Sequence, residues 1–224
     1  LLSDAVKKGL APSEAIEARQ RLRGLADTMI FSPARTPGDL LVGAYVVKPG
    51  DTLRIIARAH KISENLLAEV NKIKDKHFVR LNQTLKVING PFHAVVDKSD
   101  HEIYIYLNGT YICDMRVALG SNGSTPTGKW IVRDQLENPS WADPRTGKRW
   151  RADDPDNPIG EYWIGLEGVE GDAVGQVGFG VHGTNDESSI GQDVSMGCVR
   201  LGAKDIALVY KLLLPKLSTV TVQD

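Results

Sequence analysis

Cysteine is scarce in this chain, with 2 residues among 224, and nothing in the sequence requires the two to pair. Cys-x-x-Cys pairs, His-x-x-x-His pairs and close His/Cys clusters are all missing from the sequence, so we expect no metal site. No run approaches the roughly 18 to 20 apolar residues of a membrane-spanning helix. The 27 basic and 28 acidic side chains nearly cancel, which removes a general electrostatic reason to bind nucleic acid or an anionic membrane.

The bulk composition is ordinary for a globular protein, at 42% hydrophobic and 25% charged residues. The length suits one large domain or two smaller ones. No leader pattern of basic, apolar and small residues begins the chain at Leu1. A location outside the cytoplasm would therefore require a leader that this sequence does not include.

Residues 1–40 predict a helical segment followed by a linker. Pro12 to Glu14 resemble a helix start, and apolar residues then recur every three or four positions: Ala15, Ala18, Leu22, Leu25, Ala26 and Met29. We expect helix over residues 1–32, packing or spacing through this apolar face. Two prolines and a glycine within residues 32–39 predict the linker. A spacer, a stalk and a partner-binding helix all remain open.

Residues 41–89 predict the order strand, helix, helix, strand. A β-type run at Tyr45–Val47 is followed by Pro49-Gly50, and Asp51 is expected to cap a helix that runs through His60. Ser63 begins a second helix, and residues 84–88 return as a strand.

The stretch YVVKPGDTL, the later Asn71 and the closing LKVI resemble a LysM module along its whole length. The resemblance implies a βααβ fold that binds glycan containing N-acetylglucosamine, usually peptidoglycan or chitin. It places the groove between residues 50–53 and 76–82, and the glycan-binding candidates are Gly50, Asp51, Thr52 and Leu53. The usual Pro-Gly pair before the last strand is replaced by Leu81-Asn82-Gln83. A degenerate module that only packs or spaces is the alternative.

Residues 90–224 predict one β-rich domain, which makes the whole chain α+β. Strand-like runs begin at Phe92, Glu102 and Tyr111, and Asn108-Gly109 predicts a hairpin between the last two. Residues 138–167 predict a long lid or binding loop. Its aromatic side chains could wall a groove or pack in the core: Trp141, Trp150, Tyr162 and Trp163. A helix near 203–214 and a last strand, STVTV, complete the domain.

Cys198 and His182 form a candidate catalytic pair, 16 positions apart. His182 ends the strand-like run VGFGV, and Gly197 leaves room for a substrate carbonyl beside Cys198. Strand ends joined by a short connection could bring imidazole and thiol within hydrogen-bond reach, where the histidine would lower the thiol pKa or take its proton. Cys113 lies in an alternating run and is predicted to be a small buried hydrophobe.

The stretch HGTNDESSIGQDVSMGCVRL resembles the signature of the L,D-transpeptidase catalytic domain. That signature is His-Gly, about a dozen residues, then Ser-His-Gly-Cys, a β-branched residue and Arg or Asn. The upstream TPTG and the closing STVTV also fit, so the resemblance covers Pro91 to the C-terminus. It implies a β-sandwich-like fold, no cofactor, and peptidoglycan stem peptides and glycan strands as partners. We expect a monomer in the cell envelope, periplasmic or secreted.

The resemblance also implies a mechanism and roles. Cys198 attacks the L,D peptide bond of a stem peptide, D-Ala leaves, and an amine of a neighbouring stem takes the acyl group in a 3-3 cross-link. His182 serves as base and then acid, with the backbone of Gly183 holding its tautomer. Gly197 and Cys198 supply oxyanion-hole candidates. Arg200 is expected to orient a stem carboxylate or to form a structural ion pair. The remaining site candidates, thought more suited to stabilising turns, are Ser195 and Thr184.

Met196 stands where the resembled family commonly has histidine, and a thioether cannot donate a hydrogen bond. Activity is expected to survive, since that histidine is not the base. Three alternatives stay open. Water as acceptor would give an L,D-carboxypeptidase, a protein lysine would give anchoring to the wall, and an inactive catalytic domain would leave a glycan-binding scaffold.

Overall fold

The computed structural model describes residue 3 and residues 11–224. The chain folds into two compact units. The first comprises residues 1–93 together with 105–114, and the second comprises residues 94–104 together with 115–224.

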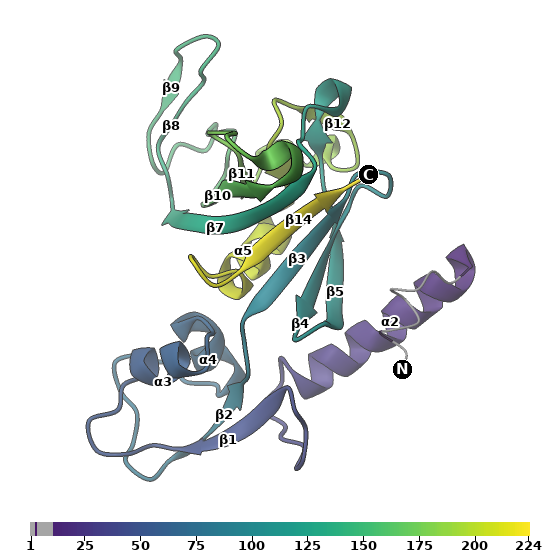
Figure 1. Ribbon diagram of the computed structural model, residues 1–224. Helices are drawn as coiled ribbons and strands as arrows, with labels where there is room; N and C mark the ends of the chain where they lie inside the picture. The colour runs from purple at the N-terminus through teal and green to yellow at the C-terminus, as the bar shows by residue number, and fades with distance from the viewer. Residues whose placement is uncertain (1–2, 4–10) are drawn as a thin grey trace. The chain divides into compact units, whose positions relative to one another are not determined.

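Helix α2, Pro12–Met29, is the long helix of the first unit (Figure 1). Ala18, Leu22 and Ala26 are buried at four-residue spacing, which confirms the apolar face expected from the sequence. The remainder of the predicted helix, residues 1–2 and 4–10, lies outside the described residues.

Lys86 fixes the C-terminal end of helix α2. Its side chain is 1% exposed, and its Nζ donates to the backbone oxygens of Met29 at 2.6 Å and Ser32 at 2.7 Å. The last carbonyls of a helix have no partner within the helix, so this lysine stabilises α2 as a C-terminal cap. Burial lowers the pKa of Lys86 to about 8, against the raising effect of Asp39.

The LysM region has the βααβ order that the sequence predicts. Antiparallel strands β1, Val42–Val46, and β2, Thr84–Ile88, flank helices α3, Leu53–Ala59, and α4, Glu64–Val70. Asn71 joins α4 to β2, since its amide donates to the Leu67 and Lys86 oxygens and its Oδ1 accepts the Lys86 N–H.

One capping prediction is wrong. Helix α3 is capped by Thr52, whose Oγ1 accepts the Ile55 N–H, rather than by Asp51. The Asp51 carboxylate instead accepts the Lys48 N–H and the Tyr45 hydroxyl, both at 2.8 Å, so it closes the preceding turn. Asn82, in place of the usual glycine, adopts a φ of 64°, a left-handed conformation that asparagine tolerates. The turn before β2 is therefore retained.

An eight-stranded sheet runs in the order β13-β11-β10-β7-β14-β3-β4-β5. Its strands in chain order are β3 Phe92–Asp97, β4 Glu102–Leu107, β5 Thr110–Arg116, β7 Gly128–Glu137, β10 Tyr162–Glu170, β11 Gly180–His182, β13 Val199–Arg200 and β14 Thr219–Gln223. The predicted hairpin at Asn108-Gly109 is present, both residues having positive φ. Cys113 is buried in β5.

Short elements surround the sheet in the second unit. Strands β6, Leu119–Gly120, and β12, Asp193–Ser195, pair in parallel, and helix α5 spans Ala203–Leu212. Three single-turn 3-10 helices lie at Ser121–Gly123, Gly171–Ala173 and Glu187–Ser189.

The expected loop at 138–167 is only partly a loop. It contains a small hairpin of β8, Trp141–Ala142, and β9, Arg149–Trp150, which extends away from the sheet in Figure 1. Strand β10 begins within it at Tyr162. The prolines and glycines of residues 138–167 made this strand hard to predict from the sequence. The strand is recognised only through its pairing with β7 and β11, which lie outside that stretch.

The α+β class is confirmed, with helices beside a β-rich C-terminal region. Among the described residues, we find no helix long and apolar enough to cross a membrane.

Candidate active site

A cavity of about 310 Å³ in the second unit contains both members of the predicted pair. Its walls come from the β8 region, β10, β11 and the turn between β12 and β13. Its lining residues are Trp141, Pro144, Pro158, Ile159, Trp163, Val177, Gly178, Phe179, His182, Ser195, Met196, Cys198 and Arg200. The cavity therefore joins a titratable pair and a guanidinium in mostly apolar surroundings, as ligand sites commonly do.

His182 is the last residue of β11, as its sequence context predicts, and is 4% exposed. Its Nδ1 lies 2.6 Å from the backbone oxygen of Gly183. A carbonyl only accepts, so Nδ1 carries the proton and Nε2 has the free lone pair in the neutral ring. This is the tautomer in which Nε2 can accept a proton.

Burial lowers the pKa of His182 to about 4, and the nearby Arg200 charge acts in the same direction. The hydrogen bond to Gly183 opposes the shift. The imidazole is thus neutral at pH 7 and available as a base.

Cys198 lies in a turn that two hydrogen bonds of Ser195 brace. Ser195 Oγ donates to the Cys198 backbone oxygen at 2.6 Å and accepts the Gly197 N–H at 3.0 Å. Gly197 has a φ of 123°, and a Cβ there would lie 2.6 Å from Phe179 Cε1, so only glycine fits. The Gly197 N–H, an oxyanion-hole candidate from sequence, is engaged by Ser195 in this arrangement.

The Cys198 thiol is half-buried, and its Sγ donates to the Gly178 oxygen at 3.6 Å. Burial raises the pKa of the Cys198 thiol, although a Gly180 backbone contact and the Arg200 charge act in the opposite direction. Thiol and imidazole are therefore both neutral at pH 7, and the thiolate has to form by proton transfer.

Arg200 is the strand partner of His182 in the parallel pairing of β11 with β13. Its backbone also exchanges two hydrogen bonds with Ala118, both at 2.9 Å, which fixes its position. The side chain lines the cavity, and its buried Nε has no hydrogen-bond partner among the described residues. An unsatisfied guanidinium N–H in the cavity that also contains the Cys198 thiol suits a carboxylate ligand.

The other residues that the sequence predicts for the site differ in whether they line this cavity. Gly183 contributes the oxygen that holds His182. Thr184 Oγ1 accepts the Asp186 N–H at 3.0 Å, a turn contact, and Thr184 is absent from the cavity lining. Trp141 and Trp163 line the cavity, whereas Trp150 stacks on Trp141 and Tyr162 packs against Tyr210.

The LysM candidates lie in the first unit. Gly50 has a φ of 85°, Asp51 closes the turn and Thr52 caps α3. Leu53 is fully buried, backbone and side chain alike, so it presents no surface to a ligand. Phe78 and Leu81, in the second predicted groove loop, are 62% and 57% exposed.

Sequence reasoning missed Phe179, Val177 and Pro158 as cavity residues. No motif marks them, because the cavity forms from segments that meet only through long-range strand pairing. A search of the described residues finds no cluster of His, Cys, Asp or Glu suited to holding a metal ion.

The chain is similar in sequence to known proteins. The chain is 29% identical to YkuD of Bacillus subtilis over 170 residues, covering 72% of this chain and 88% of that protein. It is 26% identical to YcfS of Escherichia coli over 216 residues, covering 85% and 65%. Both names carry L,D-transpeptidase. The crystal structure of L,D-transpeptidase 3 from Mycobacterium tuberculosis aligns with a TM-score of 0.48 and 17% identity, covering 64% of this chain and 66% of that one.

Two domain families match this chain, one in its middle part and one in its C-terminal part. Residues 45–87 match the LysM domain. Residues 91–222, more than half of the chain, match the L,D-transpeptidase catalytic domain. The chain therefore belongs to the L,D-transpeptidase catalytic domain family and carries a LysM domain before that catalytic domain.

Proposed function

We propose that this protein is a peptidoglycan L,D-transpeptidase in which Cys198 is the nucleophile and His182 the general base. The observation that carries the proposal is the shared cavity of Cys198 and His182, with Nδ1 tied to Gly183 and Nε2 left to accept a proton. A neutral imidazole and a neutral thiol that line the same cavity support base catalysis during attack.

The proposed first half-reaction is acylation. Cys198 Sγ bonds to the carbonyl carbon of the L,D peptide bond at stem position three while its proton passes to His182. The tetrahedral intermediate collapses, the C–N bond breaks, and the imidazolium gives its proton to the departing D-Ala amine. A thioester on Cys198 remains, and the imidazole is neutral again.

The second half-reaction is transfer to an amine of a neighbouring stem. The amine attacks the thioester carbonyl and loses a proton to His182, and the restored thiol takes that proton as the C–S bond breaks. The product is a 3-3 cross-link. Water in place of the amine gives an L,D-carboxypeptidase, and a lysine of another protein gives anchoring to the wall. A catalytically inactive glycan-binding scaffold is the remaining alternative.

Three groups are proposed to hold the substrate. The Cys198 N–H is the preferred oxyanion donor, since the Gly197 N–H already donates to Ser195. Arg200 pairs with a stem carboxylate through its unsatisfied guanidinium. In the LysM domain, the backbone of residues 50–52 is proposed to bind glycan, which would keep the chain on its polymer, whereas Leu53 is fully buried.

The wider organisation is proposed on the same basis. We assign residues 1–40 to a helical segment with a linker, 41–89 to the LysM module and 90–224 to the catalytic domain. We propose that the protein is a monomer, needs no cofactor, and acts in the cell envelope, where peptidoglycan lies.

Intact-protein mass spectrometry after incubation with a carbapenem tests the nucleophile, using the wild type and Cys198→Ala. We expect the mass of one inhibitor to be added to the wild type alone. Addition to neither protein would favour the inactive scaffold. Incubation of the wild type with a disaccharide-tetrapeptide then identifies the acceptor, because a dimer lacking one D-Ala indicates cross-linking and a free tripeptide indicates hydrolysis.

A further inference from the structure

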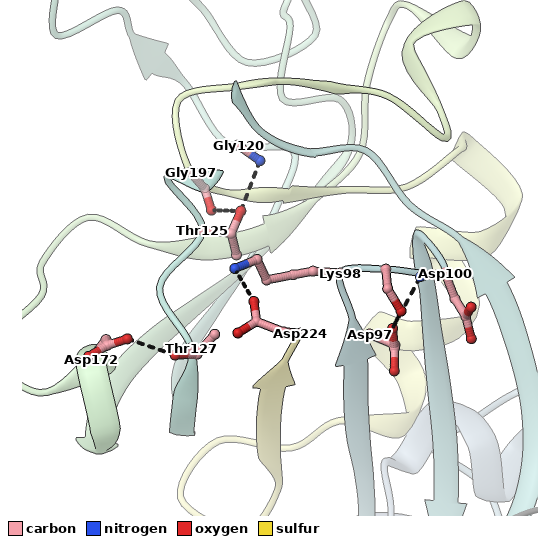
Figure 2. A network of polar contacts seen from close by, with 10 residues as sticks. Asp97, Lys98, Asp100, Gly120, Thr125, Thr127, Asp172, Gly197 and Asp224 are labelled. Carbon is pink, nitrogen blue, oxygen red and sulfur yellow. Dashed lines mark hydrogen bonds and ion pairs between the residues drawn. The ribbon is translucent and has the colours of Figure 1, made fainter. Parts of the chain in front are cut away.

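Thr125 connects two backbone segments at the turn of residues 195–198, here called the nucleophile turn. Its Oγ1 accepts the Gly120 N–H at 2.8 Å and donates to the Gly197 oxygen at 3.0 Å (Figure 2). The side chain is 3% exposed, so water cannot readily replace either bond. A hydroxyl has a single proton to donate, and here that proton goes to the residue before Cys198.

The backbone around Thr125 is closely packed. A Cβ on Gly120 would lie 2.7 Å from Gly197 Cα, and a Cβ on Gly197 would lie 2.9 Å from the Ser124 oxygen. Residues 120, 124–125 and 197 therefore form one tight crossing, with the Thr125 hydroxyl as its hydrogen-bonded link. The position of Thr125 determines where the Gly197 carbonyl points.

The orientation of that carbonyl determines the orientation of the Cys198 N–H. A peptide group is planar and trans, so the Gly197 C=O and the Cys198 N–H point in opposite directions. With the carbonyl held by Thr125, the N–H points away from Thr125 in one fixed direction. Ser195 bonds to the Gly197 N–H and the Cys198 oxygen, which belong to the peptide groups before and after the Gly197–Cys198 peptide. The Gly197–Cys198 peptide itself is held by Thr125.

We propose that Thr125 is a positioning residue for acyl transfer, which fixes the Gly197–Cys198 peptide so that the Cys198 N–H is aligned to stabilise the oxyanion. This inference rests on the proposed function of Cys198. In this proposal Thr125 does not contact the substrate. Thr125 acts only through the Gly197–Cys198 peptide group.

Two reagents distinguish an effect on the oxyanion donor from an effect on the intrinsic reactivity of the Cys198 thiol. A carbapenem acylates the thiol through a tetrahedral oxyanion, whereas iodoacetamide alkylates it at a saturated carbon and needs no oxyanion donor. We expect Thr125→Val to slow acylation about tenfold to a hundredfold, as misplacement of an oxyanion donor does, and to leave the alkylation rate within about twofold. Thr125→Ser keeps the hydroxyl and should acylate within about threefold of the wild type.

Thr127→Val is the matched control. Thr127 is two residues away and donates a comparable hydrogen bond, 2.7 Å to Asp172, that does not reach the nucleophile turn (Figure 2). We expect both of its rates to match the wild type. Circular dichroism and thermal melts check that every variant is folded.

Each outcome has a defined meaning. Normal acylation by folded Thr125→Val, equal losses of acylation and alkylation, or a similar loss in Thr127→Val would overturn the inference. If Thr125→Val does not fold, a tenfold or larger loss of acylation in Thr125→Ser would overturn it instead, because the hydroxyl is retained there. A wild type that no carbapenem acylates refutes the proposed function itself, and the inference with it.

Discussion

Trp163 lies directly opposite His182 across strands β10 and β11, with the two rings stacked at a centroid distance of 5.7 Å and an interplanar angle of 22°. An aromatic face stabilises a cation above it, and the imidazole becomes a cation during each proton transfer proposed here. Trp163 also lines the cavity, so it shields the ring from water on the face that it covers.

Trp163→Leu should therefore slow carbapenem acylation by about tenfold, because the imidazolium loses a contact of roughly 1–2 kcal/mol. Trp163→Phe, which keeps an aromatic face, should show a smaller decrease in the acylation rate. The measurement is the acylation rate constant from intact mass. Equal rates for the leucine and phenylalanine variants would show that the aromatic face contributes nothing to proton transfer.

The pH dependence of acylation follows from the two neutral partners. The base form of His182 is lost only below its pKa of about 4, so the acylation rate should stay level across pH 5–8 and fall near pH 4. Because the pKa of the Cys198 thiol is raised, iodoacetamide alkylation should keep increasing with pH beyond the ordinary thiol pKa. An alkylation rate that is already level below pH 7 would indicate a preformed thiolate–imidazolium pair.

Arg200→Gln should reduce acylation by a carbapenem, which carries a carboxylate, about tenfold to a hundredfold, the usual worth of a charged hydrogen bond. The iodoacetamide rate should change much less. Arg133→Gln is the control, since Arg133 is an exposed arginine that pairs with Asp134. A loss for both reagents would mean that Arg200 supports the fold of the turn rather than a carboxylate.

Met196→His restores the residue common in the resembled family. Met196 is 39% exposed on the cavity wall, and the base role is already taken by His182. We expect the acylation rate at pH 7 to change by no more than about twofold, in line with surface substitutions. A tenfold gain would show that the thioether limits the wild-type enzyme.

Lys86→Met should lower the free energy of unfolding by about 1–3 kcal/mol, because the Met29 and Ser32 carbonyls lose their donor in a buried place. Hydrogen exchange should accelerate at the Ile30 amide, which bonds to the Ala26 oxygen in the last turn of α2. Lys76→Met is the control, an exposed lysine that bonds only to the Asn65 side chain, with an expected loss below about 0.5 kcal/mol. Similar losses in both variants would contradict the capping role of Lys86.

Local patterns were enough to predict much of the fold. The βααβ order, the hairpin at Asn108-Gly109 and His182 at a strand end all depend on residues close in sequence. The cap of α3 could not be chosen in this way. Asp51 and Thr52 are both good caps, and the choice depends on Tyr45 and the Lys48 N–H, which occupy the aspartate.

The site shows the same division between local and long-range information. Cys198, His182 and Gly197 carry a recognisable spacing, and the structure places the first two in one cavity. Phe179 carries none, and Thr125 lies in the TPTG stretch, which does not reveal its bonds to Gly120 and Gly197, because these contacts join segments separated by many residues. Hydrogen bonds to backbone atoms are especially hard to predict, because the partner contributes no side chain to recognise.

The cap that Lys86 provides has a practical consequence for dissecting the protein. The sequence boundaries of the LysM module, residues 41–89, suggest that it could be removed and replaced by another module. Its strand β2, however, holds the end of helix α2, and α2 in turn contacts strand β5 of the β4–β5 hairpin, where Arg23 donates to the backbone oxygen of Asp114. Asn108, in the turn of that hairpin, donates to the Asn89 oxygen. A fragment trimmed at either side of the module would break this set of bonds, so a change to the glycan binding proposed for this module calls for substitutions in residues 50–52 and 76–82 rather than replacement of the module.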